Sequence, residues 1–291
     1  MALSVEKMGW PMSWQVRVVH STGYRYDLPA AQSFNEVRLT PRTDHHQVVL
    51  FSRIDTTPAT RMFRYTDYWG TSVTSFDLHA PHSELKVVAY SVVDTADERE
   101  PAQEATWKSL KRDAVVDKFG EFLQPTRYTP RDAELLAVSK RLRRGNEPVE
   151  AVLAASNWVH DQLTYRPGST GVQSSAGDAW RAREGVCQDY AHITLVLLRA
   201  MGIPARYVSG YLHTKPDTEL GKVVRAESHA WVEAWTGGWW AHDPTNAIPV
   251  GQRHVWVALG RDYADVAPLK GIYSGSGASG LDVSVEMCRL A

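Results

Sequence analysis

Residues 193–201 (ITLVLLRAM) form an almost wholly apolar run with a single charged residue, Arg199. A helix that is apolar on nearly every side is normally buried, so this run has to lie inside the protein. Gly202 is suited to cap the helix, and Pro204 prevents it from resuming. Residues 205–210 then read as a strand. The sequence therefore predicts a buried central helix around which the rest of the chain is organised.

Cys187 falls on the first turn of this predicted helix, just after the tight stretch Glu184-Gly185-Val186. Unpaired backbone N–H groups and the positive end of the helix dipole favour a thiolate at such a position. A sulfur nucleophile at the start of a buried helix is one way to build a cysteine-dependent acyl-transfer enzyme. Cys187 is therefore the candidate nucleophile.

The composition is that of an ordinary globular protein, with 291 residues, 43% hydrophobic and 22% charged. A net charge of −1 gives no general attraction to nucleic acid or anionic membranes. The two cysteines, Cys187 and Cys288, are too few for a disulfide framework or a thiolate zinc site. We expect no metal or other cofactor, no nucleic-acid partner and no membrane association. The sequence does not indicate an oligomeric state.

The first residues, MALSVEKMGWPMSW, lack a basic region followed by a hydrophobic one, so we expect no secretion signal and a cytoplasmic location. From residue 14 to about residue 93, short alternating runs are separated by turn residues, which is typical of an antiparallel sandwich or barrel. The predicted strands cover residues 14–18, 34–40, 47–54, 61–65, 73–78 and 85–93.

The polar, acidic stretch at 94–103 predicts a domain boundary, after which the spacing becomes helical. Thr129 and Pro130 read as the N-cap and first residue of a helix that ends at Gly145. A third helix covers 146–163, and a short one precedes Cys187. We predict an α+β protein with a β-rich N-terminal domain at 1–95, a helical connection at 96–145 and a catalytic domain at 146–291.

A cysteine nucleophile needs a base and a group that orients the base, and one predicted hairpin offers both. Residues 228–235 alternate, Thr236-Gly237-Gly238 is a turn signal, and residues 239–243 return. Asp243 should come back to within about one ladder position of His229. The imidazole of His229 can then bond the carboxylate of Asp243 through one nitrogen and Cys187 through the other.

Each of these residues also has a purely structural interpretation, and other candidates compete with them. Taken singly, Cys187 would be an inert core residue, His229 a strand histidine and Asp243 a turn cap. Asp189 and His192 lie roughly 200° and 140° around the helix from Cys187, so we treat both as structural. The side chain of His242 should point away from that of Asp243, and Cys288 is interpreted as a bystander.

Four sequence blocks, in order, resemble the bacterial transglutaminase-like family, which belongs to the papain-like cysteine-enzyme superfamily. The resemblance extends from about residue 146 to the C-terminus. Two further blocks resemble the β-rich region that precedes this domain in many such proteins, although Thr71 stands where the family usually has Asn. The blocks are GVCQDYA at 185–191, GIPARYV at 202–208, HAWVE at 229–233 and DPTN at 243–246, with RLTPR at 38–42 and DYWGT at 67–71.

The resemblance implies a β-rich sandwich or barrel followed by a papain-like core, in which a central helix packs on an antiparallel sheet. Carried over residue by residue, Cys187 is the nucleophile, His229 the general base and acid, and Asp243 the orienting group. The family includes peptidases, amidases, amine-transferring enzymes and inactive members, so the resemblance defines the machinery better than the reaction. Nothing resembles the calcium-binding or accessory domains of animal transglutaminases.

We expect acyl transfer on a peptide or side-chain amide through a thioester that water resolves, as in a cysteine peptidase or amidase. One alternative is transfer to an amine, for which Glu233 and the loop residues Asp262, Tyr263 and Asp265 could receive the amine. Another is a catalytically idle module that binds a peptide. Intact Cys187, His229 and Asp243 favour an enzyme.

The oxyanion hole is only partly defined by the sequence. The Cys187 backbone N–H is a natural donor, and Gln173, Tyr165 and Trp180 are alternatives for the second. The tryptophans between 231 and 240 either line a substrate groove or pack between the sheet and the helix.

Overall fold

The computed structural model describes residues 13–97, 100–102, 104–275 and 279–291. Residues 1–12, on which the expectation of no secretion signal rests, lie outside the described residues. So do parts of the acidic boundary segment at 94–103 and of the Gly/Ser-rich turn at 274–280. No helix within the described ranges is long and apolar enough to cross a membrane.

The N-terminal third consists of six strands, which confirms its predicted β-rich character. Three of them, β1, β6 and β3, lie side by side in a nine-stranded sheet, and β2, β5 and β4 belong to a four-stranded sheet. Alternate buried side chains of the two sheets, such as Phe76 and Leu85, form a common core. The strands are β1 (Trp14–Ala30), β2 (Gln32–Val37), β3 (Gln47–Thr57), β4 (Met62–Thr66), β5 (Ser72–Leu78) and β6 (His82–Thr95).

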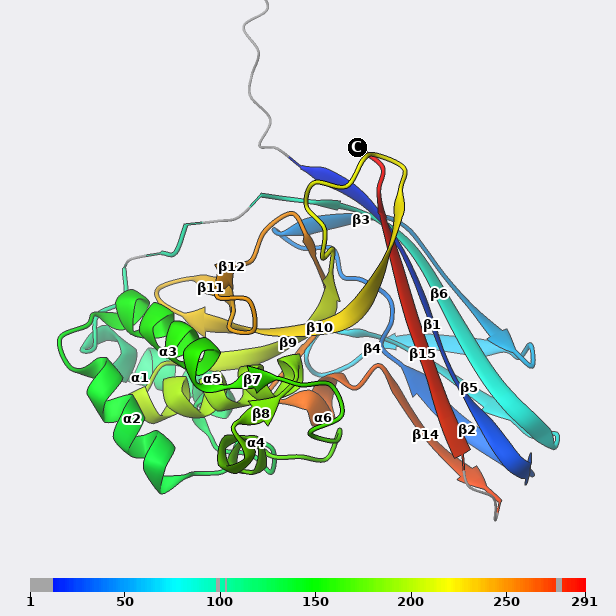
Figure 1. Cartoon of the computed structure of the whole chain (residues 1–291), viewed down its shortest axis with the longest axis horizontal. Helices are drawn as coiled ribbons and strands as arrows, with labels where there is room; N and C mark the ends of the chain where they lie inside the picture. Colours follow the sequence, from blue (N-terminus) through cyan, green and yellow to red (C-terminus); the bar gives the residue numbers. More distant parts are fainter. Residues whose placement is uncertain (1–12, 98–99, 103, 276–278) are drawn as a thin grey trace, which may run out of the picture.

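Two C-terminal strands complete these sheets. The first, β14 (Leu269–Ser274), pairs with β2, although the sequence predicted no strand there. The second, β15 (Ser279–Arg289), lies between β1 and β10 (Val223–Trp235), so that Met287 pairs with both Val18 and Val224. Figure 1 shows the red C-terminal strand running along the blue N-terminal one. The division at 95 and 145 stays a prediction, but the two ends of the chain share one β layer.

The helices gather on the opposite side of the molecule from this β layer (Figure 1). The helix predicted to begin at Thr129 begins later, with Asp132 as its N-cap, because the Asp132 carboxylate accepts the Leu135 N–H at 3.0 Å. The hydroxyl of Thr129 instead accepts a hydrogen bond from Arg199. The helices before the central one are α1 (Asp113–Phe119), α2 (Ala133–Arg143), α3 (Pro148–Gln162) and α4 (Ala176–Ala182), with 3-10 turns η1 (Ser109–Lys111) and η2 (Gly120–Leu123).

The central helix, α5 (Cys187–Met201), is buried along nearly its whole length, as predicted. Gly202 ends it in the left-handed conformation, with φ of 86°, which favours glycine. Its apolar side chains pack against α2, α3 and α4 on one side and against β10 and β9 (Ala205–Leu212) on the other. Arg199, the charged residue in the apolar run, donates to the carbonyls of Ala205 and Arg261 and so joins α5 to the following segments.

The remaining strands extend the nine-stranded sheet beside α5. β10 forms the predicted hairpin with β11 (Trp239–Asp243), and β11 pairs with β12 (Ile248–Pro249). β9 pairs with β10 and with β13 (His254–Gly260), which leads into the short α6 (Tyr263–Val266). A two-stranded parallel pair, β7 (Thr164–Tyr165) and β8 (Glu184–Gly185), precedes α5. The α+β class is thus confirmed, with a β-rich N-terminal region followed by a core built on one buried helix.

Candidate active site

Cys187 is the first residue of α5, as the sequence predicted, and its side chain is partly exposed. The Asp189 carboxylate accepts the Val186 N–H at 2.8 Å and fixes the start of the helix. A Cβ at Gly185 would lie 2.7 Å from the Asp189 side chain, so glycine is required there. At the first turn, the Cys187 N–H has no acceptor within the helix and remains available to a ligand. The Cys187 Sγ lies 4.0 Å from the Ser228 carbonyl oxygen.

His229 and Asp243 come together across the hairpin of β10 and β11. Val232 pairs with His242, so the next position along the ladder places Asp243 opposite Trp231. Trp231 is two residues from His229, so the side chains of both lie on the same face of β10. The His229 Nε2 lies 2.8 Å from the Asp243 Oδ2. Asp243 is fully buried, and only 9% of the His229 side chain is exposed. The structure therefore places the two residues in contact, as the hairpin geometry predicted.

The pKa of His229 shows how the three residues interact. Burial alone would lower it, but the charge and hydrogen bond of Asp243, together with those of Cys187, raise the pKa of His229 to about 10. Burial would likewise raise the pKa of Asp243, whereas the charge and hydrogen bond of His229, assisted by His254, hold it well below its usual range. His229 thus interacts with Cys187 as well as with Asp243, and its protonated form is favoured.

The Asp-Pro-Thr-Asn turn after β11 surrounds the Asp243 carboxylate with neutral donors. The Oδ1 atom accepts the Thr245 N–H at 2.9 Å and the Asn246 N–H at 3.3 Å. The Oδ2 atom accepts the Asn246 Nδ2 at 2.7 Å as well as His229. These bonds replace the water that the carboxylate loses on burial.

His254 is a further polar neighbour that the sequence did not single out. It begins β13 and is 1% exposed, and its Nε2 lies 3.5 Å from the Asp243 Oδ2. Because β13 pairs with β9 and not with β10 or β11, no local spacing relates His254 to Asp243. Only the long-range strand order brings the second histidine to this carboxylate.

His229, Asp243 and His254 have the residue types of a metal site, and their ligand atoms lie within 4.8 Å of one another. Tetrahedral zinc ligands about 2.1 Å from the ion stand roughly 3.4 Å apart. The 2.8 Å between the His229 Nε2 and the Asp243 Oδ2 is instead the length of a hydrogen bond. The residues as placed therefore form a hydrogen-bonded array and do not fit a tetrahedral zinc site.

The competing residues have other partners. The His192 Nε2 accepts the Tyr263 N–H at 3.2 Å, and the His242 Nδ1 lies 2.6 Å from the Ser156 Oγ on α3. Burial lowers the pKa of His192 to about 3 and that of His242 to about 4. Cys288 is buried in β15, between strands β1 and β10.

The three candidates for the second oxyanion donor differ in their surroundings. The Trp180 Nε1 donates to Glu134 at 2.9 Å, so it is already engaged on the far side of α4. The Gln173 Oε1 accepts the Tyr128 hydroxyl at 3.3 Å. Burial raises the pKa of Tyr165, as do the charge of Cys187 and a hydrogen bond with Glu227, which places the phenol of Tyr165 beside the thiol.

The tryptophans between 231 and 240 pack inside the protein. Trp231 is fully buried against Trp256, with ring centroids 5.2 Å apart. Trp235 and Trp239 pack against Phe119 with centroid separations of 4.5 and 5.3 Å. In the part of the chain that the structure describes, Trp235 and Trp239 thus join the sheet to α1, Trp231 packs among the strands, and none of the three lines the cavity beside Cys187.

That cavity, of about 880 Å³, opens between the helical side and the β layer, and it reaches Ser228 next to the thiol although Cys187 is not among its lining residues. Its wall includes Ser228, whose carbonyl faces the thiol, and Tyr263, whose pKa is raised to about 12 by burial and by the charges of neighbours that include Cys187. The other lining residues come from β1, the 125–128 loop, the 172–173 loop, the 261–271 segment and β15. The cavity is large enough for several residues of a peptide.

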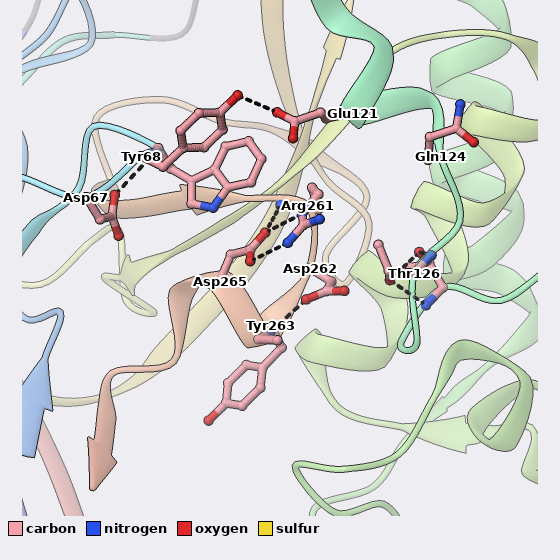
Figure 2. Close-up of polar contacts among 12 residues, drawn as sticks. Asp67, Tyr68, Glu121, Gln124, Thr126, Arg261, Asp262, Tyr263 and Asp265 are labelled. Atoms are coloured by element: carbon pink, nitrogen blue, oxygen red, sulfur yellow. Dashed lines mark hydrogen bonds and ion pairs between the residues drawn. The ribbon is translucent and has the colours of Figure 1, made fainter.

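Polar contacts hold the segment after β13, residues 261–265, beside the cavity (Figure 2). The Asp265 carboxylate faces the Arg261 guanidinium, with its Oδ2 3.0 Å from Nε and its Oδ1 3.1 Å from Nη2. Arg261 also lies 5.3 Å from the Trp69 ring. The Asp262 carboxylate accepts the Ala264 N–H and caps α6. The DYWGT block of the sequence therefore supports the loop beside the site.

Comparison with known proteins agrees with this architecture. Residues 137–244 match the Transglutaminase-like superfamily, and residues 16–94 match the Bacterial transglutaminase-like N-terminal region. An uncharacterized protein of Mycobacterium leprae is 56% identical over 278 residues, covering 96% of this chain and all of that protein. A protein-glutamine gamma-glutamyltransferase of Pseudomonas aeruginosa is 30% identical over 155 residues, which are 50% of this chain and 23% of that protein.

The solved structure of a candidate cysteine protease from Cytophaga hutchinsonii has a similar fold, with a TM-score of 0.77 and 25% sequence identity. The match covers 97% of this chain and 93% of that one. The fold and the sequence matches define a transglutaminase-like core joined to a bacterial N-terminal β region. The chain belongs to the transglutaminase-like superfamily.

The pKa of His229 gives a prediction for the pH dependence of the site. Because this pKa is raised from 6.5 to about 10, the contact with Asp243 stabilises the fold fully below pH 6.5. That stabilisation is lost as the pH rises through about 10. In an NMR titration, the His229 ring should keep its imidazolium resonances through neutral pH. His20, whose pKa burial lowers to about 4, is an internal control and should stay neutral there. A His229 midpoint near 6.5 would contradict the proposed contacts.

Proposed function

We propose that the protein is a thiol-dependent hydrolase that acts on a peptide bond or a side-chain amide. The observation that carries the proposal is the meeting of Cys187, His229 and Asp243 from α5, β10 and β11. The 2.8 Å contact between His229 and Asp243 and the effect of Cys187 on the pKa of His229 support it. These are the contacts that a cysteine nucleophile, its base and an orienting carboxylate require.

In the first step, the Cys187 sulfur attacks the carbonyl carbon and a C–S bond forms. The carbonyl oxygen takes the negative charge and is stabilised by the Cys187 N–H at the start of α5. His229 then gives its proton to the departing nitrogen, so that the C–N bond breaks and a free amine leaves. The acyl group remains on sulfur as a thioester. Asp243 keeps the His229 ring oriented and offsets its positive charge during attack.

In the second step, neutral His229 takes a proton from water, and the resulting hydroxide equivalent adds to the thioester carbon. The C–S bond breaks, the acid product leaves, and the thiolate and the imidazolium are restored. Water at about 55 M competes well unless a site binds and orients an amine. Hydrolysis therefore follows wherever no such amine site is built.

The carboxylates that the sequence offered for an amine site have other roles. Glu233 is fully buried, with its Oε2 2.7 Å from the Arg206 Nε and its Oε1 3.5 Å from the His46 Nε2. Asp265 is paired with Arg261, and Asp262 caps α6. Glu233 and Asp265 are thus paired with arginines and are not free to receive an ammonium group at the thioester, which supports hydrolysis.

Amine transfer is the second candidate, and one observation favours it. Glu227 is exposed on β10, two residues before His229, and is hydrogen-bonded to Tyr165 beside Cys187. An exposed carboxylate near a thioester can attract a lysine ammonium group. The similarity to the Pseudomonas protein, whose name describes a glutamyltransferase, points in the same direction. A catalytically idle peptide-binding module is the remaining alternative, and the cavity beside Cys187 would suit any of the three.

Three variants test the proposed roles. His229→Ala should abolish hydrolysis of a responsive peptide amide while leaving the fold intact, because it removes the proton carrier. Asp243→Ala should lower kcat strongly but incompletely, because it orients His229 and transfers no proton. His192→Ala should lower the melting temperature and leave kcat nearly unchanged, because this ring bonds only the Tyr263 backbone. Loss of activity in His192→Ala at an unchanged melting temperature, with His229→Ala active, would show that the base is misassigned.

A competition experiment separates hydrolysis from amine transfer. The protein is incubated with an acyl-donor peptide and increasing primary amine, and the free acid and the amide product are followed by mass spectrometry. We expect free acid to dominate at every amine concentration, with no saturation of the amide product. The matched control is Glu219→Gln, which changes an exposed carboxylate on a loop. If amine incorporation saturates, and Glu227→Gln abolishes it while Glu219→Gln does not, the proposed reaction is amine transfer and not hydrolysis.

A further inference from the structure

We propose that His254 is a positioning residue that holds the Asp243 carboxylate toward His229 by donating a hydrogen bond from its Nε2. This inference rests on the proposed roles of Cys187, His229 and Asp243. His254, which lies on β13, would be the fourth side chain of that array. His254 touches neither the thiol nor the cavity wall, so it would act only through Asp243.

The position of His254 is fixed by its packing. The ring lies at the start of β13, after the turn at 251–253, and is almost fully buried. Its centroid is 5.2 Å from that of Trp231, at an interplanar angle of 72°. The His229 ring lies on the same side, with a centroid separation of 6.2 Å. Asp243 is therefore contacted by two histidine rings that come from different strands.

The hydrogen bonds of His254 define which nitrogen carries the proton. The Gly251 N–H donates to its Nδ1 at 3.3 Å, so Nδ1 presents a lone pair. The neutral ring then carries its proton on Nε2, which points to the Asp243 Oδ2 at 3.5 Å. Among the described residues this buried nitrogen makes no hydrogen bond of ordinary geometry, and the Asp243 Oδ2 at 3.5 Å is the acceptor available to it. The Gly251 turn thus selects the tautomer that can donate to the carboxylate.

A neutral donor suits this position better than a cation. An arginine or lysine at this place would form its own ion pair with Asp243 and weaken the pull of the carboxylate on His229. Burial lowers the pKa of His254 despite the neighbouring carboxylate, so the ring stays neutral. It fixes the Asp243 oxygen without offsetting its charge. The full negative charge of Asp243 remains available to stabilise protonated His229.

The titratable and charged groups around His254 are few. Asp243 faces its Nε2, His229 lies beyond Asp243, and Arg253 precedes it in the chain. His242 also lies near His254, but burial lowers the pKa of His242 and this ring bonds Ser156. A change in the pKa of His229 on substitution of His254 can therefore be traced through Asp243.

The test follows the titration of the His229 ring by NMR. Removing the donor in His254→Met should loosen Asp243 and make protonated His229 less stable. The pKa of His229, raised to about 10 in the wild type, should then fall by roughly one unit. His254→Gln, whose amide N–H can replace the Nε2–H, should keep the wild-type titration.

A matched control separates positioning from stability. His82 is also a buried histidine, with its Nε2 3.1 Å from the Ser33 Oγ, but it lies in the N-terminal β layer. His82→Met should lower the melting temperature without moving the titration of His229. If His254→Met also leaves this titration unmoved, or if His254→Gln shifts it as far as His254→Met does, the positioning role is refuted.

A double-mutant cycle tests whether the effect passes through the carboxylate. In an Asp243→Asn background, His254→Met should cause no further shift, because the two changes remove the same interaction. Equal shifts in both backgrounds would overturn the inference. The measurement needs no substrate. A raised His229 pKa in the wild type with no detectable amide hydrolysis would refute the proposed reaction alone, whereas a wild-type His229 midpoint near 6.5 would refute both.

Discussion

The burial of α5 on both sides is the constraint on which the rest of the structure depends. Helices α2, α3 and α4 cover one side, and β9 and β10 cover the other. A helix enclosed in this way cannot slide or rotate without opening cavities in the core, which would cost several kcal/mol. The first residue of α5 is therefore held at a fixed place against β10. That place is beside His229, and the position of Cys187 follows from the packing of apolar side chains far from it.

The second constraint is the buried carboxylate of Asp243. A carboxylate without water needs hydrogen bonds, and this one receives them from a backbone turn, an amide side chain and His229. The backbone turn and the amide are neutral, so the charge of Asp243 acts chiefly on the His229 ring. The result is a histidine whose pKa is raised to about 10 although the ring is buried.

Features set by local sequence could be predicted, and features set by long-range pairing could not. The apolar run at 193–201 and the hairpin at 236–238 were sufficient to place Cys187, His229 and Asp243 on their elements. The N-cap of α2 was misplaced because Thr129 is engaged by Arg199 from α5. The pairing of β15 with β1, the strand β14 and the contact of His254 with Asp243 depend on strands that no tight hairpin joins. No local periodicity reports such contacts.

The most direct test of the proposed mechanism is to trap the covalent intermediate. A peptide-amide substrate is mixed with the protein, quenched in acid within its first turnover, and digested for mass spectrometry. The mechanism predicts the acyl mass on the peptide that contains Cys187, none on the peptide that contains Cys288, and no adduct in Cys187→Ala. Turnover without any acyl adduct on Cys187, or turnover by Cys187→Ala, would contradict it.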